Sequence, residues 1–276
     1  MPFGGLRVLS LESRRAKEME ALIRREGGEP FMAPSVQERA LEDHKEALEF
    51  IHRLRAGEFD LMVCMTGAGL AFLRDLAKSD GSLDELAEGL RRTFIVARGP
   101  KSVPILRELG AKAQIVVPEP NTWKEVVDAV ASRPERRVAV QEYGRPNPEM
   151  TAALEALGAQ VSCVPIYRWD LPADLAPLRE AARRLASREL DAVLFTSSIQ
   201  LDHLFLVAGE LGIEEDVRNA LQRHCALASV GPIMTEALKA AGLAADIMPI
   251  HPKMAALVKA AAERASAIVE SKRKSA

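Results

Sequence analysis

The sequence contains little of what marks several common protein classes. Cysteine occurs 3 times in 276 residues, and aromatic residues make up 4% of the chain. The cysteines are far apart and form no Cys-x-x-Cys pair, which argues against a disulfide scaffold or a zinc site. Few aromatic side chains argue against an aromatic-rich β-sandwich and favour helix-covered sheets with aliphatic cores. We therefore expect no metal, a cytoplasmic protein, and reduced core thiols at Cys64, Cys163 and Cys225.

Long apolar runs and a dominant charge are also missing. No apolar stretch is long enough to span a membrane, and the first residues do not resemble a secretory signal, so neither a membrane partner nor export is expected. The formal net charge is −2, which provides no general basic field for nucleic acid. The basic run Lys272-Arg273-Lys274 is expected to be a solvated tail.

The chain contains two copies of one α/β sequence unit. The period is far too long for a solenoid repeat, so each copy has the size of a domain. Two similar domains flanking a cleft are therefore expected, and ligands usually bind in such clefts. Three blocks recur at an offset of 131 or 132 residues: 27–34 with 158–165, 60–66 with 191–197, and 99–100 with 231–232.

Short apolar runs alternate with longer amphipathic segments along the whole chain. The short runs are rich in Val, Ile and Leu without polar alternation, as is typical of buried parallel strands. The amphipathic segments between them are expected to be helices, so the pattern predicts doubly wound α/β domains with right-handed crossovers. The predicted strands are 6–10, 30–34, 60–65, 94–97, 113–117, 137–141, 161–166, 191–196, 225–230 and 245–249.

Several helix ends carry recognisable capping residues. Asn147 followed by Pro148 predicts the start of a helix over 148–157. Thr122-x-x-Glu125 and Ser82-x-x-Glu85 predict capping boxes at two further helix starts. Left-handed C-cap positions are expected at Gly110, Gly158 and Gly242.

Two equivalent segments of the repeat indicate where the domains join. A predicted strand ends at Pro34 in the first copy and at Pro165 in the second, and each leads into a polar stretch. Because the two stretches are equivalent, they could run side by side as a paired linker over 35–40 and 165–171. Each domain would then combine parts of both copies, the first spanning 1–36 plus 170–276 and the second spanning 40–166.

Six loops are candidates for binding a ligand. In open α/β sheets, ligands bind at the carboxyl ends of the strands, where loops meet helix N-termini. Backbone N–H groups and the helix dipole make such places suited to phosphate or carboxylate. Any single Ser or Thr there is best explained as an ordinary N-cap, whereas the whole set favours a ligand site. The loops form three equivalent pairs: 66–69 with 197–200, 98–101 with 229–232, and 143–145 with 12–15.

The same loops argue against a nucleotide and draw attention to one tyrosine. Gly67-Ala68-Gly69 resembles the start of a dinucleotide fingerprint, but Phe72 stands where the third glycine belongs, and no P-loop occurs. Tyr167 follows the second strand of the second copy, beside the expected cleft. Its phenol could donate a proton to a leaving group, or it could be an interface tyrosine with a hydrated hydroxyl; both interpretations remain open.

Short motifs in order along nearly the whole chain resemble one family. Each motif is weak alone, but the ordered set is specific. They are Arg14-Arg15, Thr66-Gly67-Ala68-Gly69, Gly99-Pro100-Lys101, Gly158-x6-Pro165-Ile166-Tyr167-Arg168, Leu194-Phe195-Thr196-Ser197-Ser198, and Val230-Gly231-Pro232 followed by Thr235-Glu236-Ala237-Leu238 and Gly242. With these motifs the chain resembles the uroporphyrinogen-III synthase family.

The resemblance implies two flavodoxin-like parallel-sheet domains joined by a two-stranded linker, and a reaction that needs no cofactor. We expect the protein to be a monomer. It also implies one substrate, hydroxymethylbilane, a linear tetrapyrrole with eight carboxylates. The implied reaction closes the ring with inversion of the last pyrrole and loss of water. Tyr167, which matches the family's tyrosine, would be the proton donor. The candidate substrate-binding residues are Arg14, Arg15, Thr66, Gly67, Arg98, Gly99, Lys101, Tyr143, Gly144, Ser197, Ser198, Gln200, Gly231 and Thr235.

Two other functions use the same architecture. A non-catalytic sensor or binding protein for a small anionic metabolite would also need two domains and local anion donors, but no appended DNA-binding segment is evident. A sugar- or nucleotide-binding clamp of the periplasmic type is disfavoured by the missing export signal.

Overall fold

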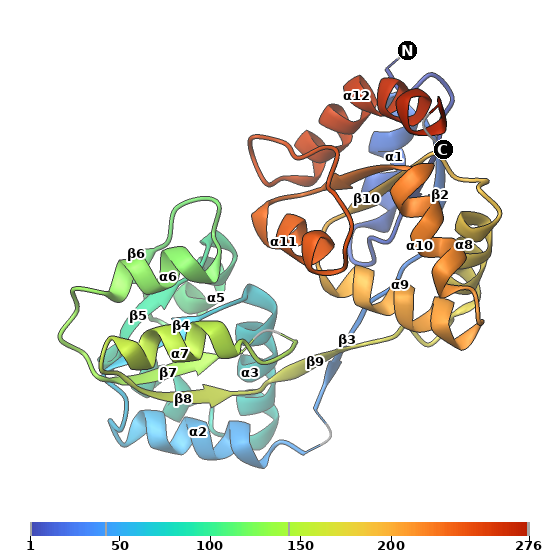
Figure 1. Cartoon of the computed structure of the whole chain (residues 1–276). Coiled ribbons are helices and arrows are strands. Elements are labelled where there is room, and N and C mark those ends of the chain that lie inside the picture. Colours follow the sequence, from blue (N-terminus) through green and yellow to red (C-terminus); the bar gives the residue numbers. More distant parts are fainter. Residues whose placement is uncertain (1, 42, 143, 275–276) are drawn as a thin grey trace. The chain divides into compact units, whose positions relative to one another are not determined.

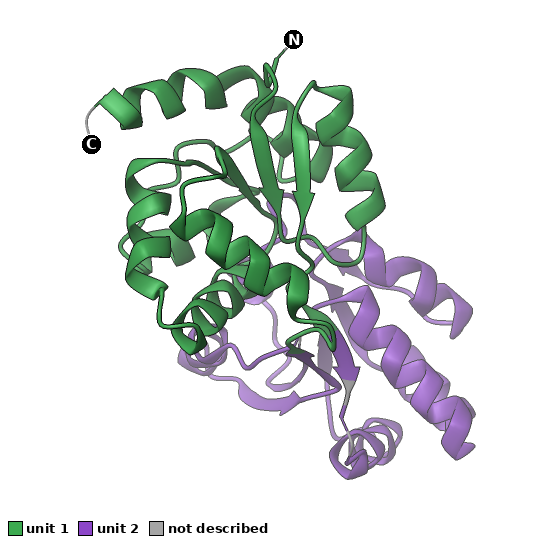
Figure 2. Ribbon diagram, turned by 90° about the vertical axis from the view of Figure 1, so that its right-hand side faces the viewer, with its two compact units in different colours: residues 1–37, 170–276 green, residues 38–169 purple. Residues whose placement is uncertain are grey.

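Two separate parallel sheets contain most of the predicted strands (Figure 1). The computed structural model describes residues 2–41, 43–142 and 144–274. The chain divides into two units, which Figure 2 distinguishes by colour. Unit 1 consists of Met1–Gln37 and Asp170–Ala276, and unit 2 consists of Glu38–Trp169. Among the described helices, none combines the length and apolar character needed to cross a membrane.

The sheet of unit 1 has four strands drawn from both ends of the chain. Their order is β11 (Ala226–Ser229), β10 (Ala192–Phe195), β1 (Arg7–Ser10) and β2 (Glu29–Met32). All three pairings are parallel, with Leu9 opposite Val193 and Phe31. The predicted strand over 245–249 is not formed as such; its position is marked by a single parallel bridge between Ala228 and Ile247.

The sheet of unit 2 repeats this arrangement with one more strand. Its order is β6 (Ile115–Val116), β5 (Phe94–Ala97), β4 (Leu61–Cys64), β7 (Arg137–Gln141) and β8 (Gln160–Val164). The pairings are again parallel, with Val63 opposite Val96 and Val140. The doubly wound α/β prediction is therefore confirmed in both units.

The two copies of the repeat exchange their halves. Strands β1 and β2 of the first copy pair with β10 and β11 of the second, whereas β4, β5 and β6 pair with β7 and β8. The exchange needs two crossing segments, and these form a two-stranded sheet of β3 (Gln37–Ala40) and β9 (Tyr167–Asp170). The predicted two-stranded linker is confirmed by this pairing.

Helices cover both faces of the unit 1 sheet, because successive strand residues point to opposite faces. One face buries Leu9, Val193 and Phe195. The other buries Val8, Ala192 and Leu194. The first face packs against α8 (Ala176–Ala186), α9 (Ile199–Glu210), α10 (Glu214–Arg223) and α11 (Pro232–Ala240); the second packs against α1 (Ala16–Arg25) and α12 (Met254–Lys274).

Unit 2 has the same three layers. Met62, Cys64 and Ile95 lie on one face of its sheet. Leu61, Val63 and Val96 lie on the other. The first face is covered by α2 (Lys45–Arg55), α3 (Gly67–Asp80), α4 (Leu83–Arg92) and α5 (Val103–Glu108), and the second by α6 (Trp123–Val130) and α7 (Pro148–Ala156).

Most of the predicted helix ends are confirmed. Thr122 and Glu125 form the capping box of α6, and the Asn147 side chain accepts from the backbone N–H of Met150 at the start of α7. Gly110, Gly158 and Gly242 all have positive φ. The capping box at Ser82 was wrong: its hydroxyl caps nothing and is buried without a partner, because Ser82 lies near a bridging backbone geometry (φ −95°, ψ 15°) and not in the extended N-cap conformation.

Two expectations about the surface were wrong. Cys163 is exposed, not a core thiol, because it lies on the sheet's edge strand β8; Cys64 and Cys225 are buried as expected. The basic run at the end of α12 is not a solvated tail, since Lys272 pairs with Asp246 at 2.6 Å and Arg273 pairs with Asp191 at 2.6 Å. These ion pairs bind the last turn of α12 to the sheet of unit 1.

Candidate functional site

The start of α3 is organised around the hydroxyl of Thr66. Thr66 has the extended backbone of an N-cap residue, and its Oγ1 accepts from the Gly69 backbone N–H at 3.0 Å. The same Oγ1 lies 3.2 Å from the Tyr167 hydroxyl, where either group can donate. The structure therefore joins two predicted site residues that are 101 positions apart in the chain.

The ring of Tyr167 is held inside unit 2. The residue is 3% exposed and belongs to the core on the α3 side of the sheet. Its ring stacks on Phe72 of α3, with centroids 5.5 Å apart and an interplanar angle of 19°. Phe72, which stands where a dinucleotide fingerprint would have its third glycine, therefore packs against Tyr167. Ring and hydroxyl both contact α3, so the phenol is fixed relative to the carboxyl end of β4.

An amide side chain occupies part of the expected anion site at this helix start. Gln141, the last residue of β7, is buried, and its Oε1 accepts from the Thr66 backbone N–H at 3.2 Å. A Cβ at position 69 would lie 2.0 Å from the Gln141 Nε2, so Gly69 leaves the space that this amide fills. Two of the backbone donors predicted for a ligand, those of Thr66 and Gly69, therefore have acceptors within the protein.

The loop 98–101 lies against the start of α3. A Cβ at position 67 would be 2.4 Å from the Lys101 carbonyl oxygen, so Gly67 permits this close approach. With its amide in the orientation that satisfies both of its ends, Asn121 donates to the carbonyl of Arg98 at 3.1 Å. The expected α-helical start after Gly99 is a 3₁₀ turn over Pro100–Ser102, with the exposed Lys101 in its middle.

The loop after β7 is positioned by the crossing segment. Gly144 has φ +66°, and a Cβ there would meet the Trp169 ring at 2.2 Å. Its carbonyl accepts from the Trp169 N–H at 3.2 Å, and it bridges Arg168. Only glycine combines this backbone conformation with such contact. Tyr143 lies outside the described residues.

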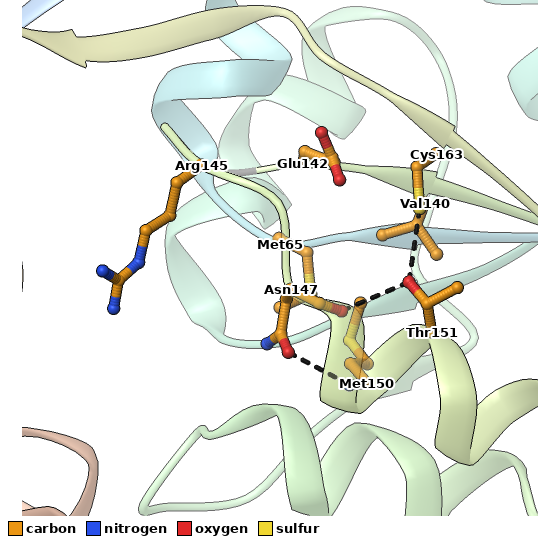
Figure 3. A pocket seen from close by; sticks show the side chains of 8 residues that line it. All are labelled: Met65, Val140, Glu142, Arg145, Asn147, Met150, Thr151 and Cys163. Atoms are coloured by element: carbon orange, nitrogen blue, oxygen red, sulfur yellow. Dashed lines mark hydrogen bonds between the residues drawn. The ribbon is translucent and has the colours of Figure 1, made fainter. Parts of the chain in front are cut away.

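A hollow at the carboxyl ends of β7 and β8 contains a carboxyl and a thiol (Figure 3). Glu142 and Cys163 are hydrogen-bonded, and partial burial raises the pKa of both groups, although the Cys163 residue as a whole is exposed on the edge strand. Thr151 Oγ1 lies 3.5 Å from the Cys163 sulfur. Arg145, a further lining residue, points away from these groups in Figure 3. A raised pKa disfavours the thiolate, which is the form in which a cysteine acts as a nucleophile.

Unit 1 has a corresponding polar network at the start of α9. The Gln200 Oε1 accepts from the backbone N–H groups of Thr196 at 2.8 Å and Ser197 at 3.2 Å, and its Nε2 donates to the Thr196 hydroxyl. That hydroxyl donates to Glu12 at 2.6 Å. Ser198, the N-cap residue, is buried in a helical conformation and its side chain makes no capping bond.

The remaining unit 1 candidates form two groups. Thr235 Oγ1 lies 2.6 Å from the Ser229 hydroxyl and donates to the carbonyl of Gly231, the N-cap residue of α11. Arg15 precedes α1, and its side chain pairs with Glu18. Its backbone N–H donates to Glu12 at 3.1 Å, so this loop joins the Gln200 network. Arg14 is exposed on the same loop.

Sequence reasoning missed residues that organise the site rather than form its loops. Gln141, Glu142 and Asn121 lacked a motif, and Glu12 and Thr196 were only neighbours of named residues. The repeat carried a usable signal for two of them, since Glu12 and Glu142 both follow equivalent central strands, β1 and β7. Within the described ranges, no group of three or more His, Cys, Asp or Glu side chains could hold a metal ion.

Comparison with known proteins agrees with these features. The family model described as uroporphyrinogen-III synthase HemD matches residues 17–259. A Methanothermobacter thermautotrophicus protein named "Putative uroporphyrinogen-III synthase" is 30% identical over 84% of this chain and 87% of its own length. An uncharacterised Bacillus subtilis protein is 28% identical over 92% of this chain and 94% of its own.

Solved structures share the fold. A crystal structure of a mutant uroporphyrinogen III synthase from Thermus thermophilus superposes with a TM-score of 0.71 at 24% identity, covering 92% of this chain and 96% of that one. The wild-type Thermus enzyme in another crystal form gives 0.56 at 25% identity, covering 96% and 99%. On the extent of the family match and the identity to its relatives, the chain belongs to the uroporphyrinogen-III synthase family.

Proposed function

We propose that this chain is a uroporphyrinogen-III synthase, which cyclises hydroxymethylbilane to uroporphyrinogen III with inversion of the last pyrrole ring. The observation that carries the proposal is the family match over residues 17–259, together with the Tyr167 phenol fixed at the start of α3. The reaction releases one water and consumes nothing else, so it requires no cofactor.

Most of the reactivity lies in the substrate. Protonation of the terminal hydroxyl lets it leave as water, and the first ring becomes a delocalised cation. Attack by the substituted carbon of the last ring gives a spiro species, which opens and recloses with that ring inverted. A final proton loss restores the aromatic pyrrole. The protein must hold the two ends of the chain together, which is catalysis by proximity.

Tyr167 is the proposed acid for the first step. Its phenolic proton passes to the departing hydroxyl, and the phenolate takes back the proton that the last ring releases, so the enzyme ends each turnover unchanged. Support comes from the hydrogen bond to Thr66 at 3.2 Å and from the stacking on Phe72.

The proposed substrate contacts are local donors, because a chain of net charge −2 offers no general attraction for an octacarboxylate. In unit 2 these are the exposed Lys101 and the loop that it shares with Arg98, and in unit 1 the exposed Arg14 and Arg15. Interactions between exposed charges are screened by salt. KM should therefore rise steeply with ionic strength while kcat changes little.

The decisive experiment is to generate hydroxymethylbilane in situ, add the protein and resolve the oxidised products by isomer. Uroporphyrinogen III in excess of the uncatalysed type I isomer supports the proposal. A product consisting of the type I isomer alone overturns the proposal. The remaining alternative is then a non-catalytic protein that binds a tetrapyrrole or another anion, and equilibrium binding of uroporphyrinogen to the same sample tests it.

The proposal extends to the state of the protein. We propose that the segments 1–36 plus 170–276 and 40–166 act as the two domains and that the chain works as a cytoplasmic monomer. The free thiols at Cys64, Cys163 and Cys225 support a reducing compartment. Sedimentation of the active protein measures its oligomeric state, and a dimer would contradict this part.

A further inference from the structure

Thr66 is placed to act on Tyr167 rather than on substrate. Its Oγ1 is the hydroxyl oxygen 3.2 Å from the phenolic oxygen, and the same Oγ1 caps α3. We infer that Thr66 is a positioning residue, whose hydroxyl orients the Tyr167 phenol and stabilises it after proton transfer. This inference rests on the proposed function only for the catalytic part.

The hydrogen-bond capacity of Thr66 allows its hydroxyl to donate to the phenolic oxygen of Tyr167. A threonine hydroxyl has one proton to donate and two lone pairs. The Gly69 N–H already uses one lone pair, at 3.0 Å. In the inferred arrangement the hydroxyl proton of Thr66 points to the phenolic oxygen of Tyr167, so the phenolic proton is not used in this hydrogen bond and can be transferred. After the transfer, the same Thr66 proton meets the phenolate in a charge-assisted hydrogen bond, which is stronger than the neutral one.

Packing and hydrogen bonding act on different parts of Tyr167. The Tyr167 ring is 3% exposed and stacked on Phe72, so packing fixes the ring. Rotation of the phenolic O–H about its C–O bond depends on the hydrogen bonds of the hydroxyl, and Thr66 Oγ1 at 3.2 Å makes one of them. Thr66 is itself held twice, by the Gly69 N–H at its hydroxyl and by the Gln141 amide at its backbone N–H. A hydroxyl held at a fixed position next to a fixed ring restricts the orientation of the phenolic O–H.

The kinetic test is a double-mutant cycle on the whole protein with Thr66→Val, Tyr167→Phe and both changes. Thr66→Val should lower kcat about tenfold with KM within about twofold, and Thr66→Ser should restore kcat to within about threefold of wild type. In the Tyr167→Phe protein, Thr66→Val should cause no further loss, because the group through which it acts is gone. Independent losses that multiply, or a rise in KM in place of the fall in kcat, would overturn the inference.

A control separates this effect from the loss of a helix cap. Thr122 is also an N-cap threonine of unit 2, accepting from the Lys124 N–H at 3.1 Å. Thr122→Val should lower the midpoint of urea unfolding about as much as Thr66→Val does, because each variant loses one N-cap, and it should leave kcat unchanged. A similar fall in kcat in both variants would reduce Thr66 to a capping residue.

A spectroscopic measurement needs no activity and so distinguishes failure of this inference from failure of the proposed function. The chain contains two tyrosines, so protein labelled with ¹³C at the tyrosine ζ carbon gives two resonances, and Tyr167→Phe identifies one of them. Thr66→Val should shift the Tyr167 resonance, whereas Thr66→Ser and Thr122→Val should not. An unshifted resonance in Thr66→Val overturns the contact whether or not the protein makes uroporphyrinogen III.

Discussion

The two units hold their crossing segments with equivalent helices but with different chemistry. In unit 2, α3 contacts Tyr167 through the ring of Phe72 and the hydroxyl of Thr66. In unit 1, α9 contacts the chain just before the crossing segment β3 through His203, whose Nδ1 lies 2.6 Å from the carbonyl oxygen of Ser35. Phe72 and His203 occupy the same place in the repeat, 131 residues apart. In both copies of the repeat the equivalent helix makes the contact, but the side chains that form the contact differ.

The helix starts show the same freedom more sharply. In unit 1 the amide that accepts from the backbone comes from the helix itself, as Gln200, and the position after β1 that is equivalent to Gln141 is the buried Leu11. In unit 2 it comes from the neighbouring strand, as Gln141, and the helix has Gly69 at the position equivalent to Gln200. At the start of each helix one side-chain amide oxygen accepts from the backbone, and a different element supplies it in each unit. The phenol, by contrast, occurs in one crossing strand alone, since β9 begins with Tyr167 and β3 begins with Gln37.

The largest expected effect comes from removing the phenolic hydroxyl, which only one of the two crossing strands carries. Tyr167→Phe should lower turnover about ten- to a thousandfold with the fold intact, because the proton donor is lost while the ring still stacks on Phe72. The matched control is Gln37→Leu at the exposed first residue of β3, which should change turnover less than about twofold. Steady-state formation of uroporphyrinogen III measures both. Equal effects at the two positions would show that the crossing segments contribute only structure.

The next effect compares the ion pairs at the amino ends of the central strands. Arg7 binds Asp191 in unit 1 and Arg137 binds Asp60 in unit 2. The Asp191 side chain is 6% exposed and also binds Arg273, whereas Asp60 is 34% exposed. Asp191→Asn should therefore cost about 2–3 kcal/mol of unfolding free energy, and Asp60→Asn about 0–1 kcal/mol. Urea unfolding with hydrogen exchange resolved by unit measures each cost.

The pH dependence of this loss has a defined sign. Burial raises the pKa of Asp191, but its hydrogen bonds to Arg7 and Arg273 outweigh burial and lower the pKa overall. A carboxyl with a lowered folded pKa stabilises the protein fully above its unfolded pKa, about 3.9, and loses that contribution as the pH falls through the folded value. The difference between wild type and Asp191→Asn should shrink below about pH 4. A difference that grows on acidification would contradict the ion-pair explanation.

The smallest expected effect comes from placing the helix amide of unit 1 at the equivalent position of unit 2. Gly69→Gln alone should cost about 1–3 kcal/mol, because a Cβ at position 69 would lie 2.0 Å from the Gln141 amide nitrogen. Gln141→Leu alone should cost about 1–2 kcal/mol, since the Thr66 N–H loses its acceptor. The double variant copies Gln200 with Leu11 and should be more stable than the sum of the single changes predicts by about 1–2 kcal/mol. Additive costs in urea unfolding would show that the two amides are not interchangeable.

What the sequence determined by itself is the set of features that depend on neighbours in the chain. Apolar runs gave the central strands, Thr122 with Glu125 and Asn147 gave helix starts, and the glycines with positive φ gave helix ends. The repeat offset also indicated the paired linker, because equivalent strand ends must lead to equivalent places. Family motifs were readable for the same reason: they are short.

Tertiary structure alone decided which distant groups meet. Gln141 reaches Thr66 across 75 residues and Tyr167 reaches it across 101, and no local pattern encodes either contact. Ser82 and Glu85 have the spacing of a capping box, but the backbone of Ser82 does not have the N-cap conformation. The basic end of α12 has the composition of a solvated tail, but it forms ion pairs with Asp246 and Asp191. Hydrogen bonds within one turn follow from the identity of a few residues, whereas contacts between elements follow from how whole sheets and helices pack.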